Sequence, residues 1–235
     1  MPAAGLASTP GSGGAGIGTP APVGASVAPI NATATVSGGG FTLTARGAAM
    51  LRHQLRITGT DQGAATGSTV VVERSAGANG WVVATTATVA SGGTFTANWK
   101  ADRVGRVTLR ALTLPPGATA PAAGKTASAA AAVSPSAGSP ALSVTIYRPA
   151  IATIFGEGFF GQRTACGQIL QPTTLGVANR TLPCGAKVTI EYGGHSISVP
   201  VIDRGPYANG ASWDLTEATA QALGMSETET IGATF

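Results

Sequence analysis

Acidic side chains beside glycine-rich turns are the first candidates for chemistry in this sequence. Asp203 follows the apolar run Val199 to Ile202 and precedes the turn at Gly205 and Pro206, so we expect its carboxylate at the rim of a sheet. A general acid needs a pKa raised by apolar surroundings, which this run and Pro206 can supply. Alternatively, Asp203 only accepts backbone hydrogen bonds in the turn. The sequence favours neither interpretation.

Two further carboxylates are candidates for a supporting role. Asp214 precedes a predicted helix, where a negative charge is favourable. Glu157 lies in a glycine-rich loop. Either can exchange a proton if Asp203 does not act alone.

The two cysteines, Cys166 and Cys184, lie 18 positions apart. A zinc site needs two more ligands, but His195 is the single histidine in that half of the chain, so we expect no metal and no cofactor. A disulfide would stabilise the domain by about 3 kcal/mol and would indicate an oxidising compartment outside the cytoplasm. Two free, buried thiols are the alternative.

Changes in composition along the chain predict how it is divided. Charged residues make up 10% of the sequence, and it contains 34 glycines and 15 prolines, which favours short strands and many turns over helices. We expect a flexible tether over 1–36, an immunoglobulin-like β-sandwich over 37–114, an Ala/Pro-rich linker over 115–142 and a compact domain over 143–235. The linker predicts that the two folded parts can reorient.

Short β-branched and aromatic runs support the sandwich and a small closed barrel. In the sandwich they are residues 41–44, 54–58, 69–74, 81–84, 95–99 and 106–111; in the barrel they are 150–155, 187–192 and 196–202. We predict one short helix, capped by Thr216 and ended by Gly224. Its apolar stripe is predicted to contain Leu215, Ala218, Ala222 and Leu223. We interpret Trp81 and Trp99 as packing residues.

Five short strings carry a resemblance to a known family. They are Gly156-x-Gly158-Phe159-x-Gly161, Thr164-Ala165-x-Gly167, Thr181-Leu182-Pro183-x-Gly185, Asp203-Arg204-Gly205-Pro206-Tyr207 and Asp214-Leu215-Thr216. Each is weak alone, but in this order and at this spacing they resemble the RlpA-like (rare lipoprotein A) double-psi β-barrel family, of the actinobacterial type. The resemblance covers nearly all residues after 143 and implies a mainly β fold with a six-stranded double-psi barrel.

The resemblance implies lytic transglycosylase cleavage of peptidoglycan glycan, without a metal. Asp203 matches the family's catalytic aspartate, and we expect it to act as acid and base. Gln168 stands where the family usually has a glutamate, and Asn179 where it has a histidine. Neither amide exchanges a proton near neutral pH. The sequence therefore also allows a module that binds or loosens the wall, as expansin-like double-psi barrels do, without cutting glycan.

Four residues near these strings are candidates for contact with glycan. The rings of Phe159, Tyr207 and Trp213 can stack on a sugar or fill the core. Arg204 is expected on the face opposite Asp203 if the strand extends that far.

The charge differs between the two folded parts. The sandwich has eight basic residues (Arg46, Arg52, Arg56, Arg74, Lys100, Arg103, Arg106, Arg110) and three acidic ones (Asp61, Glu73, Asp102). This excess predicts attraction to anionic wall polymers, although it is also typical of a solvated sheet face. We find no motif for nucleic acid, no membrane-spanning run and no visible signal peptide. The expected location is secreted or wall-associated, with peptidoglycan as the partner.

Overall fold

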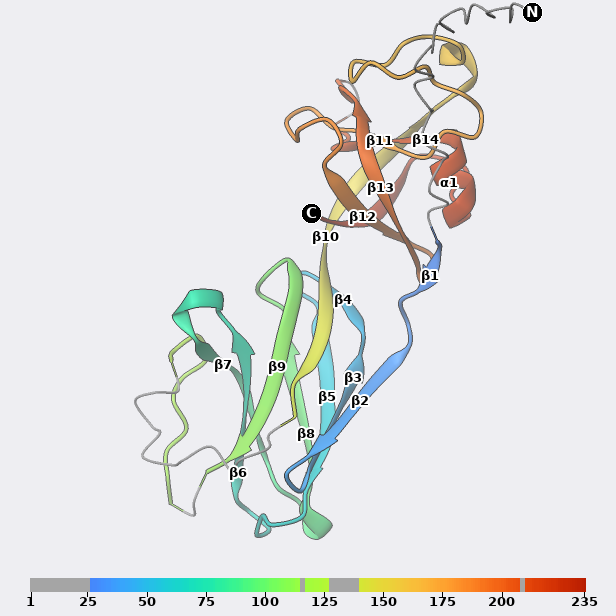
Figure 1. The fold of residues 1–235 in the computed structure, drawn as a ribbon. Coiled ribbons are helices and arrows are strands. Elements are labelled where there is room, and N and C mark those ends of the chain that lie inside the picture. The colour runs from blue at the N-terminus through green and yellow to red at the C-terminus, as the bar shows by residue number, and fades with distance from the viewer. Residues whose placement is uncertain (1–25, 115–116, 127–139, 208–209) are drawn as a thin grey trace, which may run out of the picture.

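The computed structural model describes residues 26–114, 117–126, 140–207 and 210–235, and the fold is mainly β (Figure 1). The strands are β1 (Ala28–Pro29), β2 (Thr33–Gly38), β3 (Phe41–Arg46), β4 (Ala48–Met50), β5 (Gln54–Asp61), β6 (Thr69–Ser75), β7 (Trp81–Thr88), β8 (Thr94–Lys100), β9 (Gly105–Thr113), β10 (Leu142–Phe155), β11 (Val177–Ala178), β12 (Lys187–Tyr192), β13 (His195–Asp203), β14 (Trp213–Thr216) and β15 (Glu229–Thr234). The helices are α1 (Glu217–Leu223) and the short 3-10 turns η1 (Gly77–Asn79), η2 (Ser91–Gly93) and η4 (Glu157–Phe159). Within the described residues, no helix has the length and apolar character needed to cross a membrane.

Two sheets packed face to face form the N-terminal part. One sheet has the order β2-β3-β5-β8, and the other contains β10, β9, β6 and β7, with β4 beside β10. Alternate residues of each strand are buried between the sheets, as in β3, where Phe41, Leu43 and Ala45 face the core. Trp99 lies fully inside this core. All six runs predicted for the sandwich fall within strands, whereas β2 and β4 were not predicted; the immunoglobulin-like assignment stays a prediction.

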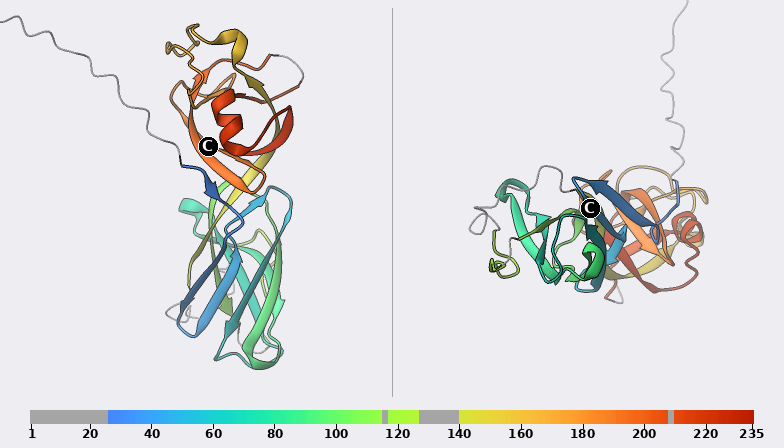
Figure 2. Two further views of the ribbon diagram at one scale, coloured as in Figure 1. Left: turned by 90° about the vertical axis from the view of Figure 1, so that its right-hand side faces the viewer. Right: turned by 90° about the horizontal axis from the view of Figure 1, so that it is seen from below.

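The long strand β10 belongs to both folded parts. Its first residues, Leu142 to Ile146, pair with β9 of the sandwich, and residues from Arg148 onward pair with β15 and β14. The sandwich and the barrel lie end to end along this strand (Figure 2). The structure thus differs from the expectation of a linker up to residue 142 and a barrel from 143, because one hydrogen-bonded strand connects the two parts. Such a strand restricts reorientation far more than a random coil would.

The segment before the sandwich also differs from a simple tether. Strand β2 begins at Thr33, inside the predicted tether, and pairs with β3 along its whole length. The two residues of β1 pair with β13 of the barrel, with Ala28 opposite Ser196. Residues 1–25, most of the predicted tether, and 127–139 of the predicted linker lie outside the described residues.

Six strands close into the C-terminal barrel, which confirms the predicted fold class. The ring runs β14-β11-β13-β12-β15-β10 and closes by pairing of β10 with β14. The contacts of β10 with β14 and of β11 with β13 are parallel, and the others are antiparallel. Inward side chains such as Ile190, Val199 and Leu215 fill the barrel. Three of its strands, β11, β14 and β15, were not predicted.

The helix α1 has the predicted caps. Thr216 accepts a hydrogen bond from the backbone N–H of Thr219, and Gly224 ends the helix in a left-handed conformation. The predicted apolar stripe was wrong in part, because Ala222 is exposed, whereas Thr219, Ala220 and Leu223 are buried.

Candidate active site

The carboxylate of Asp203 is held at the end of β13. Its Oδ1 accepts backbone N–H groups from Ala165 and Arg204, each at 2.8 Å. No described residue donates a hydrogen bond to Oδ2, so this oxygen is available to a substrate. Gly205 follows with a φ of 133°, a conformation that favours glycine. Asp203 therefore anchors the turn through one oxygen and presents the other.

A second carboxylate, Asp214, lies on β14, which is separated from β13 by the short strand β11. Asp214 pairs in parallel register with Thr153 of β10, and the Thr153 hydroxyl donates to Asp214 Oδ1 at 2.8 Å. Burial raises the pKa of Asp214, the bond from Thr153 opposes this shift, and the charge of Asp203 raises the pKa further. The helix begins only at Glu217 and is capped by Thr216, so Asp214 does not cap the helix.

Both carboxylates line one groove, of about 720 Å³, at the rim of the barrel. The groove takes residues from β10, β13 and β14, from the turn after Asp203 and from residues 226–228. Phe159 and Tyr207 are 55% and 77% exposed and also line it. A groove lined by Asp203, Asp214 and Glu227 and by exposed rings suits a polar polymer that carries sugar rings.

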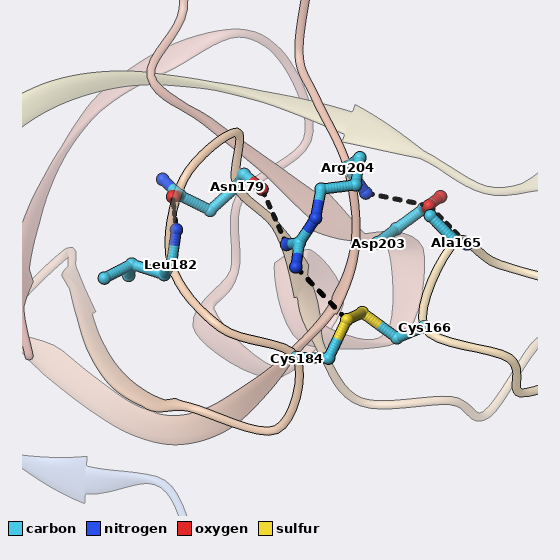
Figure 3. The surroundings of a disulfide bond; sticks show 7 residues. All are labelled: Ala165, Cys166, Asn179, Leu182, Cys184, Asp203 and Arg204. Carbon is cyan, nitrogen blue, oxygen red and sulfur yellow. Dashed lines mark hydrogen bonds between the residues drawn. A yellow bond between two sulfur atoms is a disulfide. The ribbon is translucent and has the colours of Figure 1, made fainter.

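The side chain of Arg204 is bound to the protein itself (Figure 3). Its guanidinium donates to the backbone oxygen of Asn179 at 3.1 Å and to Cys184 Sγ at 3.2 Å. The residue lines the groove, but these bonds direct its donors toward the loop that contains Asn179 and Cys184. Arg204 thereby links the strand end at Asp203 to this loop.

The predicted disulfide between Cys166 and Cys184 is confirmed, with an S–S distance of 2.02 Å. It connects two loops that both contact the end of β13. Next to Cys166, Ala165 donates its N–H to Asp203, and Cys184 accepts from Arg204. Gly185 donates its backbone N–H to Val201 at 2.8 Å. The disulfide therefore joins the loop that donates to Asp203 with the loop that accepts from Arg204.

The two amides that replace proton-transfer groups have different surroundings. Asn179 Oδ1 accepts the backbone N–H groups of Thr181 at 3.1 Å and Leu182 at 3.0 Å, and its Nδ2 donates to Ser212 at 3.3 Å. Asn179 thus shapes its own loop. The side chain of Gln168 is exposed and does not line the groove; its backbone oxygen accepts from Thr164 at 2.8 Å.

Two other predicted site residues lie away from the groove lining. Trp213 is 4% exposed, packs in the barrel core and contacts Phe235 with ring centroids 6.1 Å apart. Its alternating position on β14 turns it inward, whereas its neighbour Asp214 faces the groove. Glu157 is exposed on the turn η4. Neither is part of the arrangement around Asp203.

The sequence reasoning missed two hydrogen-bond donors of the site, the Thr153 hydroxyl to Asp214 and the Ala165 N–H to Asp203. Thr153 lies in an apolar strand, and its pairing with Asp214 depends on the parallel register of β10 and β14. The Ala165 contact joins residues 38 positions apart. A hydroxyl residue within an apolar run was a usable signal for Thr153, but a backbone donor leaves no signal in residue type.

Comparison with known proteins finds a family model that matches the barrel. Residues 149–234 match the double-psi barrel model described as "Lytic transglycolase". The chain is 43% identical over 77 residues to the "Probable endolytic peptidoglycan transglycosylase RlpA" of Synechocystis, covering 32% of this chain and 24% of that protein. It is 38% identical over 87 residues to the "Endolytic peptidoglycan transglycosylase RlpA" of Yersinia pestis, covering 36% of this chain and 24% of that protein. The chain thus spans about a quarter of these relatives.

A solved structure is also similar to part of the chain. The Streptomyces papain inhibitor aligns at 25% identity with a TM-score of 0.29, and the match covers 37% of this chain and 92% of that chain.

Proposed function

Because residues 149–234 form an RlpA-like double-psi β-barrel domain, we propose that the protein acts outside the cytoplasm as a lytic transglycosylase on the glycan strands of peptidoglycan. The observation that carries this proposal is the pair of carboxylates in one groove. Asp203 Oδ2 receives no hydrogen bond from the part of the chain that the structure describes, and Asp214 has a raised pKa. Two carboxyl groups with different surroundings are suited to opposite proton transfers.

The two carboxyl groups divide the reaction between them. Asp214, whose pKa is raised by burial, serves as the acid and gives a proton to the glycosidic oxygen as the bond to the anomeric carbon breaks. A hydroxyl of the same sugar then attacks that carbon and closes an anhydro ring, and its proton passes to Asp203. Transfer of this proton back to Asp214 restores the starting state. No water is consumed, and protons balance over the cycle.

The surroundings of each carboxyl group support its role. The Thr153 hydroxyl fixes the orientation of Asp214. The two backbone N–H groups on Asp203 Oδ1 fix that side chain, which leaves Oδ2 directed to the substrate. Phe159 and Tyr207 supply rings on which sugars stack. Gln168 and Asn179 are not needed as proton carriers in this scheme.

A module that binds glycan without cutting it is the second candidate. It is favoured by the amides Gln168 and Asn179, which stand where titratable groups are expected. In that case the groove, Phe159 and Tyr207 would retain glycan, and Asp203 would serve only to shape the turn.

Digestion of purified sacculi by matched variants separates the two candidates. Asp203→Asn and Asp214→Asn each keep the shape of the side chain but remove its proton transfer, and we expect kcat to fall by about 10²- to 10⁴-fold. Glu157→Gln is the control, because that carboxylate lies outside the groove lining, and it should keep full activity. Unchanged release of sugars by Asp214→Asn contradicts the proposed acid. Retained binding without any release by the unmodified protein would instead identify a binding module.

A further inference from the structure

One face of the sandwich has an unusually regular surface. Each strand of the sheet β2-β3-β5-β8 contains a Thr-x-Thr sequence whose threonines alternate with residues that face the core. The sequences start at Thr33, Thr42, Thr58 and Thr94. We call this outer surface the threonine face. Because of its register it forms rows across the sheet, one of which contains Thr35, Thr44, Thr58 and Thr96.

The hydroxyls of the threonine face are close enough to interact across strands. Thr35 and Thr44 are joined by a hydrogen bond of 2.9 Å, and Thr42 and Thr60 by one of 2.8 Å. Each hydroxyl has a donor and two acceptor positions, so these contacts leave capacity for a ligand. A surface of this kind can hydrogen-bond a polymer that itself carries hydroxyl groups.

Two arginines lie side by side where the threonine face approaches the barrel. Ala45 of β3 pairs with Ile57 of β5 in antiparallel register. The next position along this register therefore places Arg46 of β3 opposite Arg56 of β5. Both are exposed, and neither forms an ion pair with a described residue. Like charges on adjacent strands repel. An anion between them would relieve this repulsion and use both guanidinium groups.

The charge of the threonine face is entirely positive. Lys100 of β8 pairs with Gln54 of β5, two residues before Arg56 and on the same face of the sheet, and it is also exposed. None of the outward-facing residues of β2, β3, β5 and β8 is acidic. In contrast, Arg74 and Arg110 on the opposite sheet are neutralised by Asp102 and Glu73. Arg52, Arg103 and Arg106 also lack an ion pair with a described residue, so it is the adjacency of Arg46 and Arg56 across two strands that distinguishes the arginine pair.

A groove of about 460 Å³ lies beside the arginine pair, at the junction of the sandwich with the barrel. Its lining includes Arg46, Arg56 and His53 from the sandwich and Glu191 from the barrel. Glu191 is 7% exposed, and its Oε1 accepts the N–H of Gly194 at 3.3 Å. Because this carboxyl group is withdrawn from solvent, the accessible charges of the groove come from the sandwich.

We propose that the groove and the threonine face bind a phosphodiester polymer built from hydroxyl-bearing units. Arginine forks match the oxygens of a phosphate, and the two adjacent guanidinium groups engage one such group together. Repeated phosphates along a polymer reach Lys100 at the same time as the arginine pair. The threonine hydroxyls bond the units between phosphates. This site is separate from the groove that contains Asp203.

Binding of the full chain to soluble poly(glycerol phosphate), with poly-L-glutamate as the carboxylate polymer, tests the site. We expect Arg46→Gln/Arg56→Gln to weaken binding to poly(glycerol phosphate) by about tenfold or more at low salt. Arg103→Gln/Arg106→Gln is the matched control, since it removes the same charge from exposed positions outside the groove. It should change binding by less than about twofold, given the screening of distant charges. Thermal unfolding should be unaltered in both variants.

Three outcomes overturn the proposal. Equal loss of binding in the two double variants would mean that net charge alone attracts the polymer. An unchanged affinity of Arg46→Gln/Arg56→Gln would exclude the groove as the site. Equally tight binding of poly-L-glutamate would contradict the selection of phosphate. Because none of these variants alters the carboxylates of the other groove, activity on sacculi measures the proposed enzyme function independently.

Discussion

Removal of the disulfide tests how Asp203, the proposed proton acceptor, is held in place. The change is Cys166→Ala together with Cys184→Ala, which leaves both backbone hydrogen bonds to Asp203 possible. It removes the bond from Arg204 to Cys184 and unlinks the loop of Ala165 from the loop of Cys184. The bond joins residues separated by 18 positions. In the chain-entropy model, a loop of that length contributes about 3 kcal/mol to stability. With a urea slope of about 1 kcal/mol/M for a domain of this size, the midpoint should fall by about 3 M.

Hydrogen exchange of the backbone amides in β12 and β13 at increasing urea concentration measures the urea midpoint of the barrel alone. We expect the variant, assayed where it is still folded, to lose kcat by about tenfold to a hundredfold because Asp203 is less well oriented. Its KM should change little, since Phe159 and Tyr207 are not held by the disulfide. A midpoint shift below about 1 M, or a folded variant with unchanged kcat, would refute the reasoning. Alkylation of the unreduced protein should detect no free thiol.

Two further predictions concern stability. Burial raises the pKa of Glu191 above its ordinary 4.5, so the folded state binds this proton more tightly than the unfolded state does. The free energy of unfolding therefore falls as pH rises through the folded-state pKa. Glu191→Gln should reduce the difference in melting temperature between pH 4 and pH 8, and an unaltered difference would contradict this. Asn179→Ala should cost about 1–3 kcal/mol in urea unfolding, because two loop N–H groups lose their acceptor, whereas Asn179→Asp should keep most of the stability. Equal stability of these two variants would argue against the loop role.

Much of the fold was predictable from local patterns. Alternating β-branched runs identified most sandwich strands, and the capping threonine and final glycine of α1 were visible in the sequence. The short strands β11 and β14 were not, because two to four residues carry too little periodicity. The first half of the shared strand β10 was missed because it directly follows an Ala/Pro-rich segment. Its pairing with β9 depends on residues far apart in the sequence, which local composition does not reveal.

The candidate site was predictable only in part. Asp203 and the cysteine pair were found from residue type and position. The role of Asp214 depends on the parallel pairing of β14 with β10, which brings Thr153 to its carboxylate. Trp213 and Asp214 are adjacent in sequence but face opposite sides of one strand. The sequence alone did not show which of the two faces the groove.

The central claim is that the groove containing Asp203 and Asp214 cuts glycan without using water. Digestion of purified sacculi in water labelled with oxygen-18, followed by mass spectrometry, tests it most directly. Closure of the anhydro ring predicts products that contain no label and are lighter by one water than hydrolysis products. Asp214→Asn should release them about 10²- to 10⁴-fold more slowly. Labelled reducing ends would show hydrolysis and would contradict the account.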